Sequence, residues 1–175
     1  MSDGSDPQLA DDKRRRDARR LLEHVLEEKR KVSDEGRPEA VKRQHEQGKL
    51  TARERVEYFC DEGTFDEIGQ LAAPAMATPE MFDWSREDAP ADGVVVGIGE
   101  VDDRTIGVAA TDFTVKGGSI GHTTSEKIHR MMDIAGRQGF PVVLFWEGGG
   151  HRIQEGLDAR PFAHGDNGTF DLQAT

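Results

Sequence analysis

The sequence predicts an α/β fold built around one sheet, and two observations carry this prediction. Residues 93–113 contain two runs rich in Val, Ile and small residues that have the pattern of strands, and residues 141–146 (PVVLFW) have the pattern of a short buried strand. A helical pattern over residues 124–138 lies between the second and the third of these strands, and glycines in series follow both of them. The order strand, glycine loop, helix, strand, glycine loop is typical of α/β domains.

The 175-residue chain is acidic, with a formal net charge of −11, and its length suits one domain with an appended arm. Its charge is uneven, because residues 1–60 sum to +1 and residues 61–175 sum to −12. This acidity argues against a protein that binds duplex nucleic acid, which needs a basic surface. No segment approaches the roughly 18 apolar residues of a membrane-spanning helix, and the first residues lack the apolar core of a signal peptide. We therefore expect a cytoplasmic protein that binds neither nucleic acid nor membrane.

Residues 1–35 are expected to form a charged arm, with a disordered tip and a helix over residues 9–33. Leu21, Leu22, Val25 and Leu26 recur at helical spacing within it. A cationic run, 13–16, continues at Arg19 and Arg20. This run is either a solvated helix face or a surface that faces phosphates or a partner.

The next elements precede the strands. Residues 36–38 break the first helix, and a short helix is expected over residues 38–47. Thr51 and Glu54 have the spacing of a capping box, so a further helix should begin at Ala52 and end near Gly63. Residues 71–92 lack clear periodicity and are expected to form a long loop.

The helix between the second and third strands has clear end signals. Thr123 and Glu126 have the spacing of a second capping box, and Gly139 suits the position after the last helical residue. Ile128, Met131, Met132 and Ala135 would face the core. Another helix is expected to begin near His151.

Two glycine loops are the most informative chemical feature: residues 116–121 (KGGSIG) and residues 147–151 (EGGGH). Glycine leaves backbone N–H groups uncovered, and two such groups aimed at one point can hold an oxyanion, such as the oxygen of a thioester that becomes an enolate. The same loops could cradle a phosphate, or they could be turns that only need positive φ. Neither loop has the spacing of a Walker A motif or a dinucleotide fingerprint.

Other candidate chemistry is sparse. The six histidines lack metal-ligand spacing, and Cys60 is the single cysteine, so we expect no disulfide within the chain and no bound metal. We expect Cys60 to be buried and inert. Asp112 and Glu147 each end a strand beside a glycine loop, where they could orient loop amides or act as acids.

Three segments together resemble a known family. Residues 43–69 (RQHEQGKLTARERVEYFCDEGTFDEIG), residues 92–135 and residues 147–156 (EGGGHRIQEG) occur in the order and at separations found in the carboxyltransferase β subunits of acyl-CoA carboxylases. The resemblance is to the N-terminal portion of the propionyl-CoA and methylcrotonyl-CoA carboxylase type. It covers about residues 38–157 and leaves residues 1–35 unmatched.

The resemblance implies a crotonase-like α/β spiral and transfer of a carboxyl group from carboxybiotin to the α-carbon of an acyl-CoA. It implies that the backbone N–H groups of Gly149, Gly150 and His151 hold the thioester oxygen. It also implies a CoA-handling part; its members are Lys49, Arg53, Arg55, Gly117, Gly118, Ser119 and Gly121. The implied partners are acyl-CoA, a biotin carboxylase or biotin carrier subunit that bears the biotin, and further copies of the chain in a hexamer.

Two departures from the family pattern stand out. Family members commonly have Ser-Gly-Gly-Ala where residues 148–151 are Gly-Gly-Gly-His. Either sequence provides the same backbone N–H donors. Family subunits also continue beyond the length of this chain. Residues 36–175 are thus expected to form only the N-terminal part of a carboxyltransferase domain, supplying the acyl-CoA half-site and inactive on its own.

Two other functions remain open at this point. The chain could belong to a stand-alone crotonase-type enzyme acting on acyl-CoA, such as a decarboxylase. It could instead be a non-catalytic module that binds a larger carboxylase subunit through its charged arm.

Overall fold

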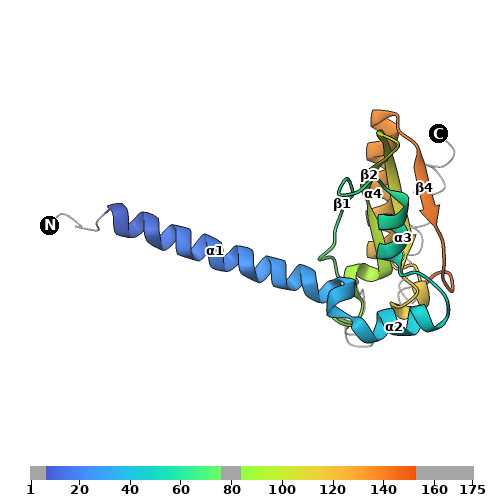
Figure 1. Cartoon of the computed structure of the whole chain (residues 1–175), viewed down its shortest axis with the longest axis horizontal. Coiled ribbons are helices and arrows are strands. Elements are labelled where there is room, and N and C mark those ends of the chain that lie inside the picture. Colours follow the sequence, from blue (N-terminus) through green and yellow to red (C-terminus); the bar gives the residue numbers. More distant parts are fainter. Residues whose placement is uncertain (1–6, 76–83, 153–175) are drawn as a thin grey trace.

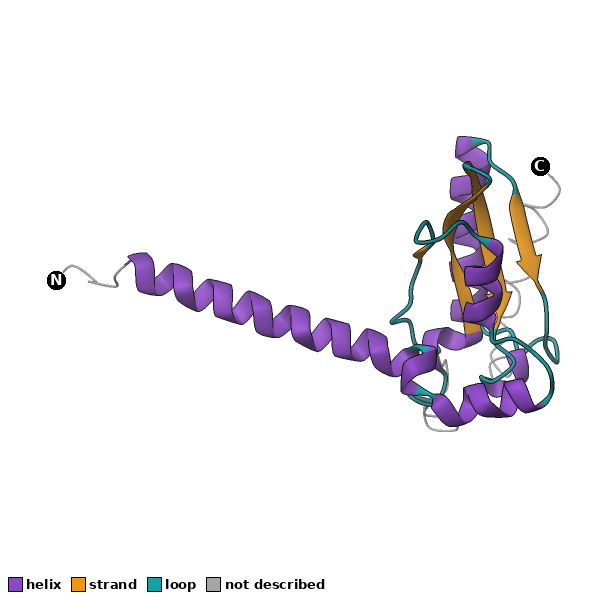
Figure 2. Ribbon diagram, viewed as in Figure 1, coloured by secondary structure: helices purple, strands orange, loops and turns teal. Residues whose placement is uncertain are grey.

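The structure is a computed structural model, and it describes residues 7–75 and 84–152. Its sheet has the strand order β1 (Asp66–Glu67), β2 (Val94–Val101), β3 (Arg104–Thr111) and β4 (Val142–Phe145). The first two pairings are antiparallel, and β4 joins β3 in parallel (Figure 2). The three strands expected from the sequence are therefore confirmed, and the two-residue β1 is additional.

Helices cover both faces of this sheet (Figure 1). On one face, Val56 of α3 (Ala52–Phe59) packs with Val95 and Val108. On the other face, Ile128 and Met131 of α4 (His122–Gln138) pack with the alternate strand residues, which are Val94, Val96 and Ala109. This alternation follows from the two-residue period of a strand. Burial of each such side chain contributes about 1.5–3 kcal/mol.

Small residues in the strands allow this close packing. A Cβ added to Gly107 would lie 2.4 Å from the Met131 sulfur, and one added to Gly97 would lie 2.3 Å from the Asp66 carbonyl oxygen. Glycine at Gly107 lets α4 pack closely on the sheet, and glycine at Gly97 lets β1 lie close to β2.

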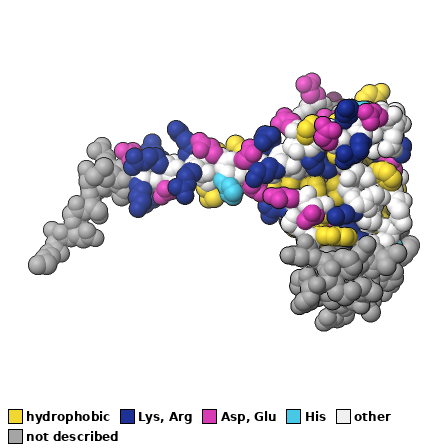
Figure 3. Space-filling model, turned by 90° about the horizontal axis from the view of Figure 1, so that it is seen from below, with side chains coloured by type: hydrophobic (Ala, Val, Ile, Leu, Met, Phe, Trp, Pro, Cys, Tyr) yellow, Lys and Arg dark blue, Asp and Glu magenta, His cyan; other side chains and the backbone are white. Residues whose placement is uncertain are grey.

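The arm is a single long helix, α1 (Pro7–Val32), which projects away from the sheet (Figure 1). It leads into a short 3-10 turn, η1 (Asp34–Gly36), and α2 (Pro38–Glu46), so the two helices expected here are confirmed to within two residues. Basic side chains line much of α1 (Figure 3). Leu21, Leu22 and Leu26 are more than half exposed on it.

The two predicted capping boxes have different outcomes. The first is confirmed, because the Glu54 N–H donates to Thr51 Oγ1 at 3.1 Å and the Thr51 N–H donates to Glu54 at 2.8 Å. The second is wrong, because α4 begins at His122, one residue before Thr123, with Gly121 as its N-cap. The expected end at Gly139 is confirmed by a left-handed φ of 75°.

The remaining expectations concern loops. Described residues within 71–92 form turns and irregular structure, ending in a short turn η2 (Pro90–Gly93) that buries Ala91 and Asp92. Cys60 is buried, as expected. The helix expected near His151 would begin at the edge of the described residues, and most of it lies outside them.

Candidate functional site

The two glycine loops lie side by side at one end of β3 and β4. The Gly149 N–H donates to the Gly117 carbonyl oxygen at 3.2 Å, and the Ile120 N–H donates to that of Gly150 at 2.9 Å. The Arg152 N–H returns a bond to the Ile120 oxygen at 2.8 Å, which makes a short parallel bridge between Ile120 and His151. The structure thus brings together both loops that the sequence singled out.

Several of these positions require glycine. A Cβ on Gly118 would lie 2.1 Å from the Glu147 carbonyl oxygen, and a Cβ on Gly148 would lie 2.2 Å from that of Gly118. Gly117, Gly118 and Gly150 also have positive φ, between 64° and 91°. The loops therefore approach each other more closely than turns that only need positive φ would require.

The three predicted oxyanion donors differ in this arrangement. The Gly149 N–H is engaged by Gly117, whereas the Gly150 N–H has no acceptor among the described residues. The bridge to Ile120 uses the Gly150 carbonyl oxygen and the Arg152 N–H, which flank His151. The His151 N–H therefore lies on the opposite edge of the segment. Of the three, the Gly149 N–H is the one whose bond holds the two loops together.

Glu147 connects the second loop to two of the predicted CoA residues. Lys49 Nζ lies 2.7 Å from Glu147 Oε1, and the Arg55 guanidinium contacts Oε2. Lys49 Nζ also lies 5.0 Å from the centre of the Phe113 ring. Although desolvation raises the pKa of the Glu147 carboxyl, hydrogen bonds from Lys49 and Arg55 outweigh it and hold that pKa below its usual value. Glu147 is therefore ionised at neutral pH, which argues against its predicted role as an acid.

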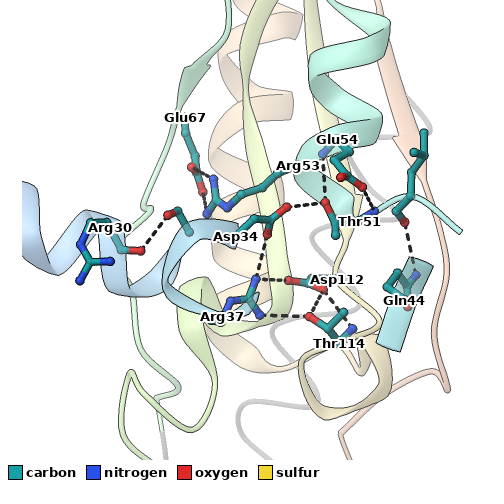
Figure 4. Close-up of polar contacts among 12 residues, drawn as sticks. Arg30, Asp34, Arg37, Gln44, Thr51, Arg53, Glu54, Glu67, Asp112 and Thr114 are labelled. Carbon is teal, nitrogen blue, oxygen red and sulfur yellow. Dashed lines mark hydrogen bonds and ion pairs between the residues drawn. The ribbon is translucent and has the colours of Figure 1, made fainter. Parts of the chain in front are cut away.

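Arg53 lies in a different environment from Lys49 and Arg55. Its guanidinium lies 2.5 Å and 3.1 Å from the carboxylate oxygens of Glu67, and the two side chains are 13% and 10% exposed (Figure 4). Residues two apart on a helix point to different sides, which separates Arg53 from Arg55. A role for Arg53 in CoA binding stays a prediction, and in this structure its charge is committed to Glu67.

Asp112 belongs to a polar network at the base of the arm (Figure 4). Arg37 donates to Asp112 Oδ2 at 2.8 Å and also contacts Asp34, while the Thr114 N–H donates to Asp112 Oδ1 at 3.0 Å. Asp34 in turn accepts from Thr51 Oγ1 at 2.5 Å. Asp112 thus ties η1 to the end of β3, and the predicted acid role finds no support in these contacts.

Sequence reasoning missed a buried ion pair beside the loops. Arg152 lies 2.5 Å from Asp92, and their side chains are 1% and 0% exposed. Arg152 also donates to the Ser119 carbonyl oxygen at 3.1 Å and contacts Ser119 Oγ at 3.3 Å. Both residues lie in segments that resemble the family, 92–135 and 147–156, but nothing local in the sequence pairs them, because they are 60 positions apart.

Lys127 of α4 is a second buried cation. Its Nζ donates to the carbonyl oxygens of Ala91 at 2.8 Å and Val94 at 2.7 Å. Burial lowers its pKa to about 8. Lys127 therefore fixes the turn before β2 against α4.

Within 7–75 and 84–152, no helix is both long enough and apolar enough to cross a bilayer. The same residues contain no group of three or more His, Cys, Asp or Glu arranged to hold a metal ion.

Comparison with known proteins places this site in a family. A model of the carboxyl transferase domain matches residues 43–163. A propionyl-CoA carboxylase carboxyltransferase subunit of Haloferax mediterranei is 41% identical over 138 residues, which cover 79% of this chain and 26% of that protein. The methylmalonyl-CoA decarboxylase subunit alpha of Propionigenium modestum is 39% identical over 142 residues, covering 81% of this chain and 27% of its own length. The chain thus spans about a quarter of the length of the curated relatives it matches.

Solved structures give the same result for the fold. A transcarboxylase 12S hexamer with methylmalonyl-coenzyme A and methylmalonic acid bound superposes with a TM-score of 0.78 at 37% identity, covering 87% of this chain and 29% of that one. The beta subunit of P. aeruginosa geranyl-CoA carboxylase superposes with a TM-score of 0.62 at 28% identity, covering 90% and 27%. The described α/β unit is therefore part of a crotonase-like fold, as the resemblance implied. Because the family model covers well over half of the sequence, the chain belongs to the carboxyl transferase domain family.

Proposed function

We propose that this chain supplies the acyl-CoA half-site of a biotin-dependent carboxyltransferase, which moves a carboxyl group between carboxybiotin and the α-carbon of an acyl-CoA similar to propionyl-CoA. The observation that carries the proposal is the pairing of the two glycine loops, which leaves the Gly150 N–H without an acceptor among the described residues. Membership of the carboxyl transferase family supports the same activity.

The proposed role of the loops is electrostatic. Removal of a proton from the α-carbon places negative charge on the thioester oxygen, and backbone N–H groups fixed in advance stabilise that charge. The N–H groups of Gly150 and His151 would hold this oxygen, because they lie on the segment that is hydrogen-bonded to Ile120 of the 116–121 loop. The partner's carboxybiotin would supply the carboxyl group, so the chain's own task is to hold and align the acyl-CoA.

The CoA part would bind near Lys49 and Arg55. Glu147 neutralises one of these two charges and holds both side chains beside the second loop. The remaining positive charge suits a phosphate of CoA. Gly117, Gly118, Ser119 and Gly121 of the facing loop complete this proposed surface, with Arg53 as a more distant candidate.

The proposed assembly contains several copies of the chain and a biotin-bearing partner. The hexameric transcarboxylase 12S neighbour supports a homo-oligomer. We place the protein in the cytoplasm, which agrees with its single cysteine.

The test uses the natural polypeptide that carries this sequence, purified with its partner subunits. Propionyl-CoA, bicarbonate and ATP should give a carboxylated CoA product, and avidin should stop the reaction because it sequesters biotin. Product formation that is insensitive to avidin, or an assembly that binds acyl-CoA without carboxylating it, would contradict the proposal.

Decarboxylation is a second candidate, because the Propionigenium modestum relative is named as a decarboxylase subunit. In this version, the same site removes a carboxyl group from an acyl-CoA and passes it to biotin. Methylmalonyl-CoA supplied to the biotinylated assembly without ATP would then carboxylate the biotin. A stand-alone decarboxylase is less favoured, because the carboxylate beside the loop, Glu147, is held ionised by two cations.

A further inference from the structure

We propose that Asp92 and Arg152 are positioning residues of the acyl-CoA site, whose ion pair fixes the two glycine loops against each other. This inference rests on the proposed function. According to this proposal, the buried ion pair sets the direction in which the Gly150 and His151 N–H groups point.

Arg152 reaches the first loop through several groups at once. Its backbone N–H donates to the Ile120 oxygen at 2.8 Å, and its guanidinium contacts both the carbonyl oxygen and the hydroxyl of Ser119. The remaining guanidinium nitrogen lies 2.5 Å from Asp92 Oδ1. One side chain therefore joins the end of the second loop to the middle of the first.

Asp92 anchors this arginine to the start of α4. Its Oδ2 accepts the Thr124 N–H at 2.7 Å, and Thr124 Oγ1 lies 2.9 Å from the same oxygen and 2.6 Å from the Asp92 carbonyl oxygen. A carboxylate in this position also interacts favourably with the positive end of the helix dipole. Asp92 itself has a positive φ of 52°, which is uncommon for a residue other than glycine.

The burial of this pair favours a role in positioning over a role in stability. The two side chains are 0% and 1% exposed, and the cost of removing two charges from water offsets much of their attraction. What such a pair does provide is a fixed geometry, because a planar guanidinium holds several acceptors in set directions. The Trp84 ring lies 5.6 Å from this guanidinium and 4.2 Å from Lys116 Nζ of the first loop, and it adds a flat apolar contact to both.

A change in this geometry should affect catalysis more than binding. The charged members of the proposed CoA surface, Lys49 and Arg55, are held by Glu147 and not by this pair, although Arg152 does contact Ser119 of the same surface. Gly150 and His151, in contrast, directly precede Arg152. Since misplacement of a catalytic group by about 1 Å can reduce a rate about 100-fold, loss of the pair should lower kcat far more than it changes KM for acyl-CoA, to which Ser119 is one contributor.

The test compares three variants in the natural, assembled protein. Asp92→Asn weakens the ion pair, and Arg152→Lys keeps the charge but cannot reach Asp92 and Ser119 together. Asp34→Asn is the matched control, because Asp34 also accepts from an arginine and a threonine hydroxyl but lies in the network at the base of the arm. We expect kcat to fall about 100-fold for Asp92→Asn and at least 10-fold for Arg152→Lys, with KM changed less than about threefold and the control close to wild type.

Amide hydrogen exchange gives a readout that does not depend on activity. In Asp92→Asn and Arg152→Lys, the Ile120, Gly149 and Arg152 amides should exchange at least 10-fold faster, while the amides of β2 and β3 keep their wild-type rates. Faster exchange throughout the sheet would overturn the proposal, because it would indicate general destabilisation. A kcat loss no larger than that of Asp34→Asn would also overturn it. If wild type itself transfers no carboxyl group but the loop amides respond as expected, the proposed function fails while the positioning of the loops stands.

Discussion

Gly118 lies against Glu147 so closely that a Cβ on Gly118 would be 2.1 Å from the Glu147 carbonyl oxygen. This contact joins the middle of the first glycine loop to the start of the second, just after β4 ends. It explains why the two loops have to be rich in glycine, and it can be tested by adding a single methyl group.

Gly118→Ala should destabilise the protein by about 2 kcal/mol or more, because a left-handed φ of 64° costs a non-glycine residue about 1–2 kcal/mol and the clash adds to it. Gly136→Ala is the matched control, because a Cβ on this glycine of α4 would meet nothing within 4 Å. The control should be neutral or more stable by up to about 1 kcal/mol. Chemical denaturation of both variants measures the difference, and equal effects would contradict the close approach of the loops.

Thr51→Ala should lower the free energy of unfolding by about 1–2 kcal/mol, because it removes a side-chain cap of α3. Thr123→Ala should change it by less than about 0.5 kcal/mol, since the cap predicted at Thr123 does not form. Thermal or urea unfolding of the two variants checks this pair. A loss at Thr123 as large as that at Thr51 would show that the helix start is misplaced.

Glu147 should contribute to stability in a pH-dependent way. Its folded-state pKa is lowered from the usual 4.5, so its contribution is present above about pH 4.5 and is lost as the pH falls through the folded-state pKa. The difference in unfolding free energy between wild type and Glu147→Gln should therefore be constant near neutral pH and shrink in acid. A difference that does not vary between pH 7 and pH 3 would mean that Lys49 and Arg55 do not hold this carboxylate.

Lys127 should also make stability rise with pH, but in the alkaline range. Its pKa is lowered from 10.5 to about 8 in the folded state, so the unfolded chain binds more protons between these values and stability rises with pH. Relative to Lys127→Met, wild type should gain on the order of 2–3 kcal/mol from pH 7.5 to pH 10.5. Denaturation curves at several pH values check this. If the difference in unfolding free energy between wild type and Lys127→Met does not change with pH, the amine is exposed to water.

The sequence predicts the parts of this structure that depend on neighbours along the chain. The cap at Thr51, the left-handed Gly139 and the β2–β3 pair each follow from residues a few positions apart. The cap of α4 could not be predicted, because the carboxylate that accepts the Thr124 N–H is Asp92, 32 positions earlier.

The same distinction applies to the candidate site. Both glycine loops could be identified from the sequence, because glycines in series after strands are a local signal. The partners of their flanking charges could not: Lys49 and Arg55 meet Glu147 more than 90 positions later, while the neighbouring Arg53 turns to Glu67. Which of several clustered cations faces a site depends on the tertiary fold.

The paired glycine loops should hold the thioester oxygen of an acyl-CoA. Isotope-edited infrared difference spectroscopy tests it directly, using propionyl-CoA labelled with carbon-13 at the thioester carbonyl and bound to the natural assembled protein. We expect a carbonyl stretch at lower frequency than in buffer, with the shift reduced in Gly118→Ala and kept in Gly136→Ala. A bound thioester whose carbonyl frequency equals that in buffer would show that the loops do not hold this oxygen.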